Sequence, residues 1–165
     1  MKKKSAVTRH LSSASVRGLI GLLLVLVLAA CAAPAPKKEV LTLSLQATAD
    51  VNPDLQGRPS PVVVHILELK STEQFNSLDY MSLTDPSGSA LGSDLVNRSQ
   101  VVLSPGTTHA TTLELDPAVT SIGFVAGYRD IDNATWRLAV PITQGQTMSI
   151  NVTLGQVQMT AAPAN

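Results

Sequence analysis

Segments in which apolar and polar residues alternate with a period of two dominate this sequence. In VLTLSLQA, residues 40–47, leucines alternate with threonine, serine and glutamine, which is typical of a strand with one buried face. Similar segments recur between turn-forming stretches such as SPGT, LDPA and TQGQ, at 62–69, 101–103, 111–115, 121–128, 135–142 and 148–154. Seven strands separated by such turns predict an all-β fold of two packed sheets, a β-sandwich.

The longer segments also predict which side chains enter the core. VVVHILEL, residues 62–69, is apolar on both faces, which favours a central strand. In each of the last three segments one face is apolar: Ile122, Phe124, Ala126 and Tyr128; then Trp136, Leu138, Val140 and Ile142; and then Met148, Ile150, Val152 and Leu154.

One stretch after the second predicted strand has helical spacing instead. In STEQFNSLDYMSL, residues 71–83, Phe75 and Leu78 lie three positions apart, and Ser71 with Gln74 has the pattern of a capping box. The sequence therefore predicts a small helical insertion after the second strand.

The N-terminus has the pattern of a secretory leader. Five basic residues precede an apolar run over 19–30, and the twelve residues of this run are fewer than the roughly 20 that a membrane-spanning helix needs. The run ends in LAAC, which resembles a bacterial lipobox, in which the cysteine is lipidated and becomes the first mature residue. Cys31 is the only cysteine of the chain and has no partner for an internal disulfide, so we expect it to carry the lipid.

These patterns divide the chain into four parts. They are a signal peptide that is removed (1–30), the lipidated cysteine with a tether (31–39), the β-sandwich domain (40–155) and a C-terminal tail (156–165). Because alanine and not aspartate follows Cys31, the resemblance to the lipoprotein sorting pattern implies the outer membrane. Five of the twelve basic residues leave with the leader, so the formal net charge falls from 0 to −5, and we expect no nucleic-acid partner.

The residues of the stretch 50–61 do not match the ligand pattern of a calcium-binding loop. Asp50, Asn52 and Asp54 occupy the first three ligand positions of an EF-hand-like loop, but Leu55 stands where glycine is needed and Pro61 stands where the closing glutamate belongs. The sequence predicts no metal site here.

The sequence also lacks a complete set of residues for a catalytic site or a zinc site. Ser60, His65 and Asp50 would supply the residue types of a hydrolytic triad, but no G-x-S-x-G motif presents a serine. His65 lies within a predicted strand, where a structural role is expected. His65, His109 and a lipidated cysteine do not make a set of zinc ligands. We expect no enzyme and no cofactor.

The connection DVNPDLQGRPSP, residues 50–61, is stiff and polar. Pro53, Pro59 and Pro61 fix their own φ angles and favour extended conformations in the residues before them. A loop ordered in advance loses less freedom on docking, which favours affinity. The composition alone is consistent both with a stiff connector and with a docking loop.

Two motifs in combination make the chain resemble the TssJ family (also called VasD or SciN), outer-membrane lipoproteins of the type VI secretion system. They are NPD-x-x-GRPSPVVV from Asn52 and YRD-x-DNA-x-WR from Tyr128, and the resemblance extends from about Leu41 to Leu154. It implies a transthyretin-like two-sheet β-sandwich with a small helical addition and no enzymatic activity. It also implies a lipid anchor in the outer membrane and a domain that faces the periplasm.

The resemblance further implies a protein partner. Members of the family bind the periplasmic C-terminal domain of TssM and, through it, join TssL in the trans-envelope complex, and the loop implicated in TssM contact matches residues 50–61. We expect the contact surface to consist of Asn52, Asp54, Leu55, Gln56 and Arg58, with Pro53, Gly57 and Pro59 shaping it. Leu55 would be an apolar anchor, and Arg58 a bidentate donor to a carboxylate or carbonyl.

Two further expectations accompany this assignment. The stretch from Tyr128 to Trp136 is interpreted as a structural hairpin whose Asp130, Asp132 and Asn133 satisfy turn backbone, and bridges from Arg129 and Arg137 to these acids stay open. The alternative function is a generic periplasmic β-sandwich lipoprotein that binds cell wall or a small ligand. That alternative predicts a concave site lined by aromatic residues, of which the chain has few.

Overall fold

A computed structural model of the chain describes residues 39–143 and 145–163. The predicted signal peptide, Cys31 and the tether up to Lys38 lie outside these residues. Within the described part, no helix is long and apolar enough to cross a membrane.

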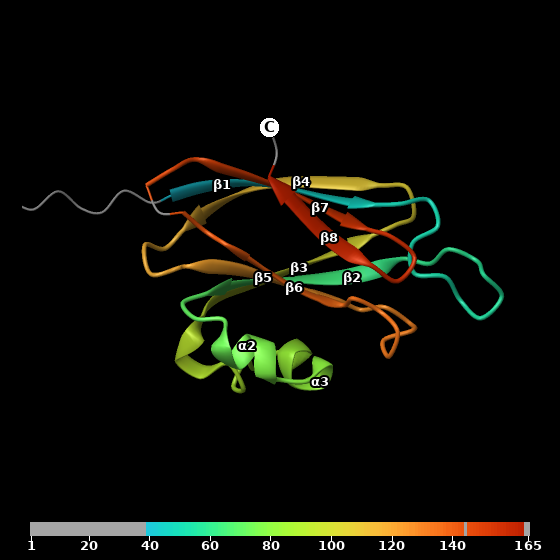
Figure 1. Cartoon of the computed structure of the whole chain (residues 1–165), viewed down its shortest axis with the longest axis horizontal. Helices are drawn as coiled ribbons and strands as arrows, with labels where there is room; N and C mark the ends of the chain where they lie inside the picture. The colour runs from blue at the N-terminus through green and yellow to red at the C-terminus, as the bar shows by residue number, and fades with distance from the viewer. Residues whose placement is uncertain (1–38, 144, 164–165) are drawn as a thin grey trace, which may run out of the picture. The chain divides into compact units, whose positions relative to one another are not determined.

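Eight strands form two four-stranded sheets that face each other (Figure 1). The sheets have the orders β4-β1-β7-β8 and β3-β2-β5-β6. The strands of the first are β1 (Glu39–Ala47), β4 (Thr108–Leu115), β7 (Met148–Leu154) and β8 (Met159–Pro163), and those of the second are β2 (Val62–Leu69), β3 (Leu95–Leu103), β5 (Ser121–Ala126) and β6 (Arg137–Pro141). All neighbouring strands pair antiparallel except β1 and β7, which pair parallel. The predicted two-sheet β-sandwich is confirmed.

Two strands differ from the expectation. β8 lies in the segment expected to be a C-terminal tail and pairs with β7. Its small and polar residues gave no alternation, although Met159 is buried in the core. β3 begins at Leu95, six residues before the predicted segment. The sequence did not indicate this first part of the strand, because β3 is an edge strand and its polar residues there face solvent.

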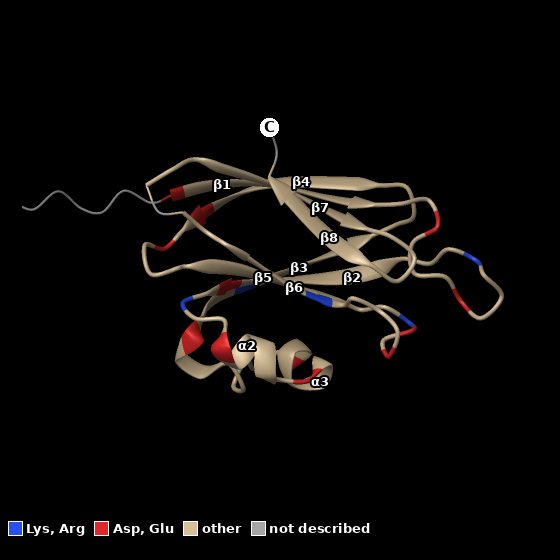
Figure 2. Cartoon of the chain, in the orientation of Figure 1, with Lys and Arg blue, Asp and Glu red and all other residues tan. Residues whose placement is uncertain are grey.

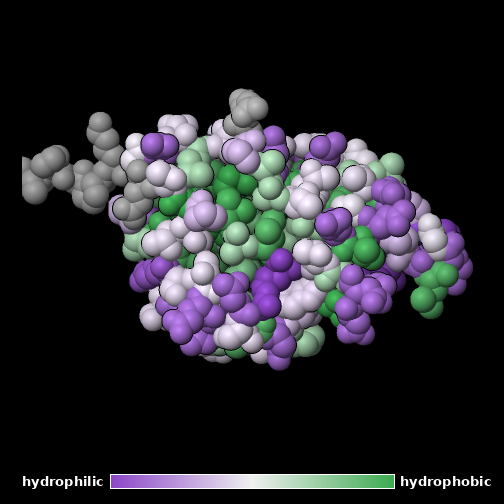
Figure 3. Space-filling view, in the orientation of Figure 1, coloured by the Kyte–Doolittle hydropathy of each residue, from purple (hydrophilic) through white to green (hydrophobic). Residues whose placement is uncertain are grey.

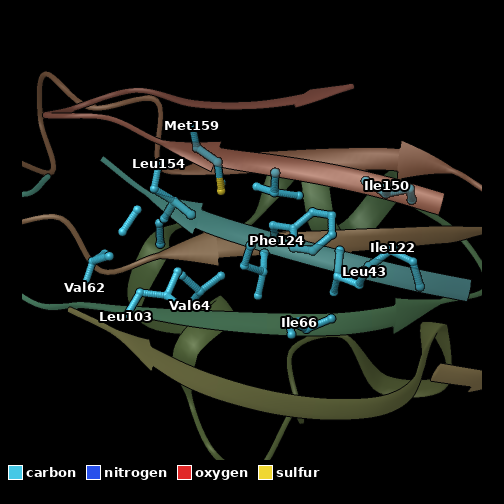
Figure 4. Close-up of a cluster of buried hydrophobic side chains, with 14 of the residues drawn as sticks. Leu43, Val62, Val64, Ile66, Leu103, Ile122, Phe124, Ile150, Leu154 and Met159 are labelled. Atoms are coloured by element: carbon cyan, nitrogen blue, oxygen red, sulfur yellow. The ribbon is translucent and has the colours of Figure 1, made fainter. Parts of the chain in front are cut away.

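The core fills the space between the sheets (Figure 4). Alternate leucines of β1, Leu41, Leu43 and Leu45, are at most 1% exposed. The predicted apolar face of β5, which includes Ile122 and Phe124, is buried against them. Complete burial of such a side chain stabilises the fold by about 1.5–3 kcal/mol relative to its exposure, so the alternation fixes which face of each sheet points inward.

The helical insertion covers the outer face of the second sheet (Figure 1). It consists of α2 (Glu73–Ser77), α3 (Tyr80–Thr84) and the 3-10 helix η1 (Gly92–Asp94). Phe75 and Leu83 pack there against Leu67 and other outward side chains of the sheet, which confirms that β2 is covered on both faces. Phe75 lies so close to Gly123 that a Cβ atom there would come within 2.8 Å of its ring.

The start of α2 differs from the predicted capping box. Thr72 is the N-cap and makes no side-chain cap hydrogen bond. The Ser71 hydroxyl accepts a hydrogen bond from the Glu73 N–H at 3.2 Å, so the helix begins one residue later than the pattern indicated.

Two arginines from opposite edges of the second sheet hold the helices in place. Arg137 of β6 donates from Nη1 to the carbonyls of Phe75 and Leu78, at 2.9 and 2.8 Å. Arg98 of β3 donates from Nη2 to the Leu83 carbonyl at 2.8 Å and from Nη1 to the Asp85 carbonyl at 2.6 Å. The last carbonyls of a helix lack intrahelical partners and favour a cation, so Arg137 is used at α2 and not in a bridge to the acids of the hairpin.

Candidate functional site

The connection between β1 and β2, residues 50–61, projects from one end of the sandwich (Figure 1). Hydrogen bonds fix its base: the Ser60 N–H donates to the Val51 carbonyl at 3.1 Å, and the Asn52 N–H donates to the Gln156 carbonyl at 3.1 Å. Val51 itself is completely buried. The connection is therefore ordered by hydrogen bonds and packing as well as by its prolines.

Asn52 anchors this loop to a second one. Its backbone has a positive φ of 50°, a conformation that asparagine adopts more readily than most residues. Its side chain donates from Nδ2 to the Pro61 carbonyl and accepts at Oδ1 from the Arg129 N–H, both at 2.8 Å. Asn52 is only 3% exposed. This burial differs from the expectation that Asn52 lies on the contact surface, and its role is to position the loop.

Asp54 and Arg58 close the outer part of the loop. Asp54 Oδ1 accepts from the main-chain N–H groups of Gln56 and Arg58, both at 2.9 Å. Its Oδ2 accepts from Arg58 Nε at 2.8 Å and lies 2.7 Å from Nη2. These hydrogen bonds lower the pKa of Asp54. Gly57, at φ 75°, completes the turn by donating to the Asp54 carbonyl.

Leu55 occupies the tip of this closed turn. Its relative exposure is 101%, the highest of the large apolar residues in the described chain. Figure 3 shows hydrophobic surface at the end of the projecting loop, next to hydrophilic residues. The rigid turn holds an apolar side chain in water, where it contributes nothing to the core.

A groove of about 810 Å³ runs beside the tip and involves three connections. Arg129 and Asp130 come from the β5–β6 connection and Val157 from the β7–β8 connection, and the rest of the lining comes from the projecting loop: Pro53, Asp54, Leu55, Gln56 and Arg58. Figure 2 shows both signs of charge on the loop and on the β5–β6 connection. The sequence predicted a loop between the first two strands, but it did not indicate that the other two connections line a groove with this loop.

The β5–β6 connection is partly what the sequence indicated. Asn133 donates from Nδ2 to both carboxylate oxygens of Asp130, at 2.9 and 3.1 Å, a local contact of the kind expected for a structural turn. However, Arg129 and Asp130 also line the groove. The signal was present in the YRD motif, but nothing local in it indicates contact with a loop 77 positions earlier.

The residues weighed for metal binding and catalysis do not converge. Asp50 accepts from the side chains of Thr48 and Gln156, and Asn52 and Asp54 have the separate partners given above. In the part of the chain that the structure describes, no three His, Cys, Asp or Glu residues are grouped to hold a metal ion.

The proposed triad is not assembled either. Ser60 Oγ donates to the Arg58 carbonyl at 3.4 Å. His65 is half-buried on β2, where desolvation and then the charge of Arg98 lower the pKa of its imidazole. Its Nδ1 has no hydrogen-bond partner within the described chain, so it does not orient a serine.

Together these features define a class: a β-sandwich with one helix-covered sheet and an ordered loop that presents an apolar tip. A protein-family model described as type VI secretion lipoprotein (VasD, EvfM, TssJ, VC_A0113) matches residues 39–157. The chain belongs to this family, as the two motifs indicated. No curated protein matches the chain.

Solved structures agree with the family. The type VI lipoprotein TssJ1 of Pseudomonas aeruginosa is 33% identical, with a TM-score of 0.75 over 78% of this chain and 98% of that chain, which confirms the transthyretin-like sandwich. The Serratia marcescens protein Lip, a membrane-bound component of a type VI system, is similar in fold, at 24% identity and a TM-score of 0.69 over 76% and 97% of the two chains. A structure described as the TssM C-terminal domain (869–1107) from EAEC contains a chain that is 27% identical, with a TM-score of 0.63 over 76% and 99%.

Proposed function

We propose that this type VI secretion lipoprotein is anchored in the outer membrane, faces the periplasm and binds the periplasmic domain of TssM. By this contact it tethers the trans-envelope complex, which also contains TssL, to the outer membrane. The observation that carries the proposal is the ordered loop over 50–61, which holds Leu55 fully exposed beside a groove.

The loop has the physical properties of a docking element. Burial of a leucine side chain is worth about 1.5–3 kcal/mol, and a few apolar anchors commonly supply most of the affinity of an interface. Asn52, Asp54 and Gly57 already fix the loop conformation, so little conformational entropy remains to be lost on binding. The free energy of burying Leu55 against a partner would therefore contribute to the affinity with little loss to conformational entropy.

A structural neighbour supports the choice of partner. The similar chain in the structure described by the TssM domain is matched over 99% of its length by 76% of this chain. It is therefore shorter than this chain of 165 residues, whereas the range 869–1107 is longer. This difference points to a second, lipoprotein-like chain that accompanies the TssM domain there.

The course of β1 supports the tethering role. β1 begins at Glu39, which accepts from the Gly145 N–H in the β6–β7 connection, and it ends at Ala47 before the docking loop. Its nine residues separate these two ends by about 26 Å at a rise of about 3.3 Å per residue. Because Cys31 precedes Glu39, a lipid on Cys31 would anchor one end of the sandwich and leave the loop at the other.

Calorimetry with matched surface substitutions tests the proposal. The chain from Ala32, which contains the compact unit Lys37–Asn165, is titrated with the purified periplasmic domain of the cognate TssM. Leu55→Asp should weaken binding by at least about tenfold. Met81→Asp is the control, because Met81 is also an exposed apolar residue, at 74%, but lies on α3. Equal affinities of the two variants would show that the loop tip is not the docking site.

A further inference from the structure

The charged residues that line the groove differ in how they are paired. Asp54 and Arg58 form an ion pair at 2.7 Å. Asp130 accepts from Asn133 at both carboxylate oxygens. By contrast, the guanidinium of Arg129 makes no hydrogen bond or ion pair with any residue of the described chain, although its main-chain N–H is bonded to Asn52. Arg129 is therefore the one charged side chain of this groove that has neither a hydrogen bond nor an ion pair in the described protein.

The position of Arg129 is nevertheless fixed. Its N–H donates to Asn52 Oδ1 at 2.8 Å, and Tyr128 before it is 5% exposed and belongs to the core. Both contacts use groups other than the Arg129 side chain. The fold thus holds the main chain in place and leaves five N–H donors at the groove, close enough to Asp54 for their charge to contribute to the lowered pKa of that carboxyl.

We infer that Arg129 is a second contact residue of the docking site and binds a carboxylate of the protein segment that covers Leu55. This inference rests on the proposed function. The occupant is a protein segment that carries one aspartate or glutamate next to an apolar residue. Guanidinium and carboxylate match in a planar, bidentate geometry, and arginine is enriched among the residues that dominate interfaces.

The surrounding charges restrict the occupant further. A neutral segment would desolvate the Arg129 charge without compensation, which is unfavourable. A polyanion would meet the carboxylates of Asp54 and Asp130 in the same groove. A single carboxylate satisfies Arg129 and leaves the Asp54–Arg58 pair intact.

Charge variants of Arg129 test the inference with the TssM periplasmic domain as the probe. Arg129→Glu should raise the Kd by at least about tenfold, and Arg129→Lys should raise it by about threefold, because lysine keeps the charge but loses the fork. Lys70→Glu, an equal charge change on an exposed residue after β2, should leave the Kd unchanged. Arg129→Gln should bind with a weaker dependence on salt than the wild type. All variants should keep the wild-type urea midpoint.

The outcomes separate this inference from the proposed function. Arg129→Glu with the affinity of Lys70→Glu would overturn the role of Arg129, whereas a loss for Leu55→Asp in the same series would keep the docking loop. Absence of binding by the wild type would overturn both. Recovery of Arg129→Glu binding by a TssM variant in which one acidic residue is changed to arginine would identify the bound carboxylate.

Discussion

Asn52 connects the folding of this domain to the geometry of the loop over 50–61, so its replacement gives the most informative stability measurement. Asn52→Ala removes the hydrogen bonds to the Pro61 carbonyl and the Arg129 N–H. A buried main-chain group left without a partner costs about 1–3 kcal/mol. Because both groups lie near the surface, we expect about 1 kcal/mol from each. Alanine at a positive φ adds about 1–2 kcal/mol, so the free energy of unfolding should fall by about 3–4 kcal/mol.

Asn52→Gly separates the two contributions. Glycine adopts a positive φ without steric cost, but it has more conformational freedom to lose on folding, about 0.5–1 kcal/mol. The variant loses the same two hydrogen bonds. It should therefore be less destabilising than Asn52→Ala by about 0.5–1 kcal/mol.

Urea unfolding followed by the fluorescence of Trp136, the only tryptophan, measures both variants. The slope of the unfolding free energy against urea concentration should stay at the wild-type value, because the surface area that is exposed on unfolding is unchanged. A loss below about 1 kcal/mol in Asn52→Ala would refute the reasoning, because the loop would then open independently of the sandwich. Equal losses in both variants would refute the contribution of the positive φ.

Two further predictions concern the second sheet. Arg137→Gln removes charge-assisted bonds to Phe75 and Leu78 and a guanidinium 5.0 Å from the Trp136 ring, so urea unfolding should show a loss of about 2–3 kcal/mol; an unchanged midpoint would mean that packing alone holds α2. The pKa of His65 is lowered below its ordinary 6.5, so the unfolded chain binds this proton more readily, and stability that is complete above pH 6.5 should decline as the pH falls below that value. His65→Gln should reduce this decline between pH 6.5 and 5.5, and an identical decline would assign it to other groups.

The sequence predicts most of the fold because its strongest signal, the pattern of apolar residues, marks the side chains whose burial stabilises the fold most. Alternation identifies β1, β5 and β7 by their buried residues, and an apolar run identifies β2, which is covered on both faces. Alternation fails for β3 and β8, where polar or small side chains on edge strands face solvent and give no period. Main-chain pairing with β2 and β7 defines these two strands, and a single-sequence pattern does not report on it.

The site was predictable only where its residues are neighbours in sequence. The prolines, Gly57 and Leu55 mark the loop at 50–61 within twelve residues. The contacts from Asn52 to Arg129 and to Gln156 span 77 and 104 positions. They depend on the way in which the two sheets bring three connections to one end, so the groove and the position of Arg129 in it needed the structure.

The residues at this end of the sandwich are of two kinds: those whose side chains form hydrogen bonds within the fold and those whose side chains do not. Asn52 and Asp54 direct their side chains to main-chain groups of the loop and maintain its shape. Leu55 and Arg129 have fixed main chains, but the Leu55 side chain is fully exposed, and the Arg129 side chain makes no hydrogen bond or ion pair within the described protein. A side chain that adds little to the stability of the fold, yet is held in place, can contribute its interactions to binding. Substitutions of the first kind should therefore change the urea midpoint, and substitutions of the second kind should change only the affinity for the partner.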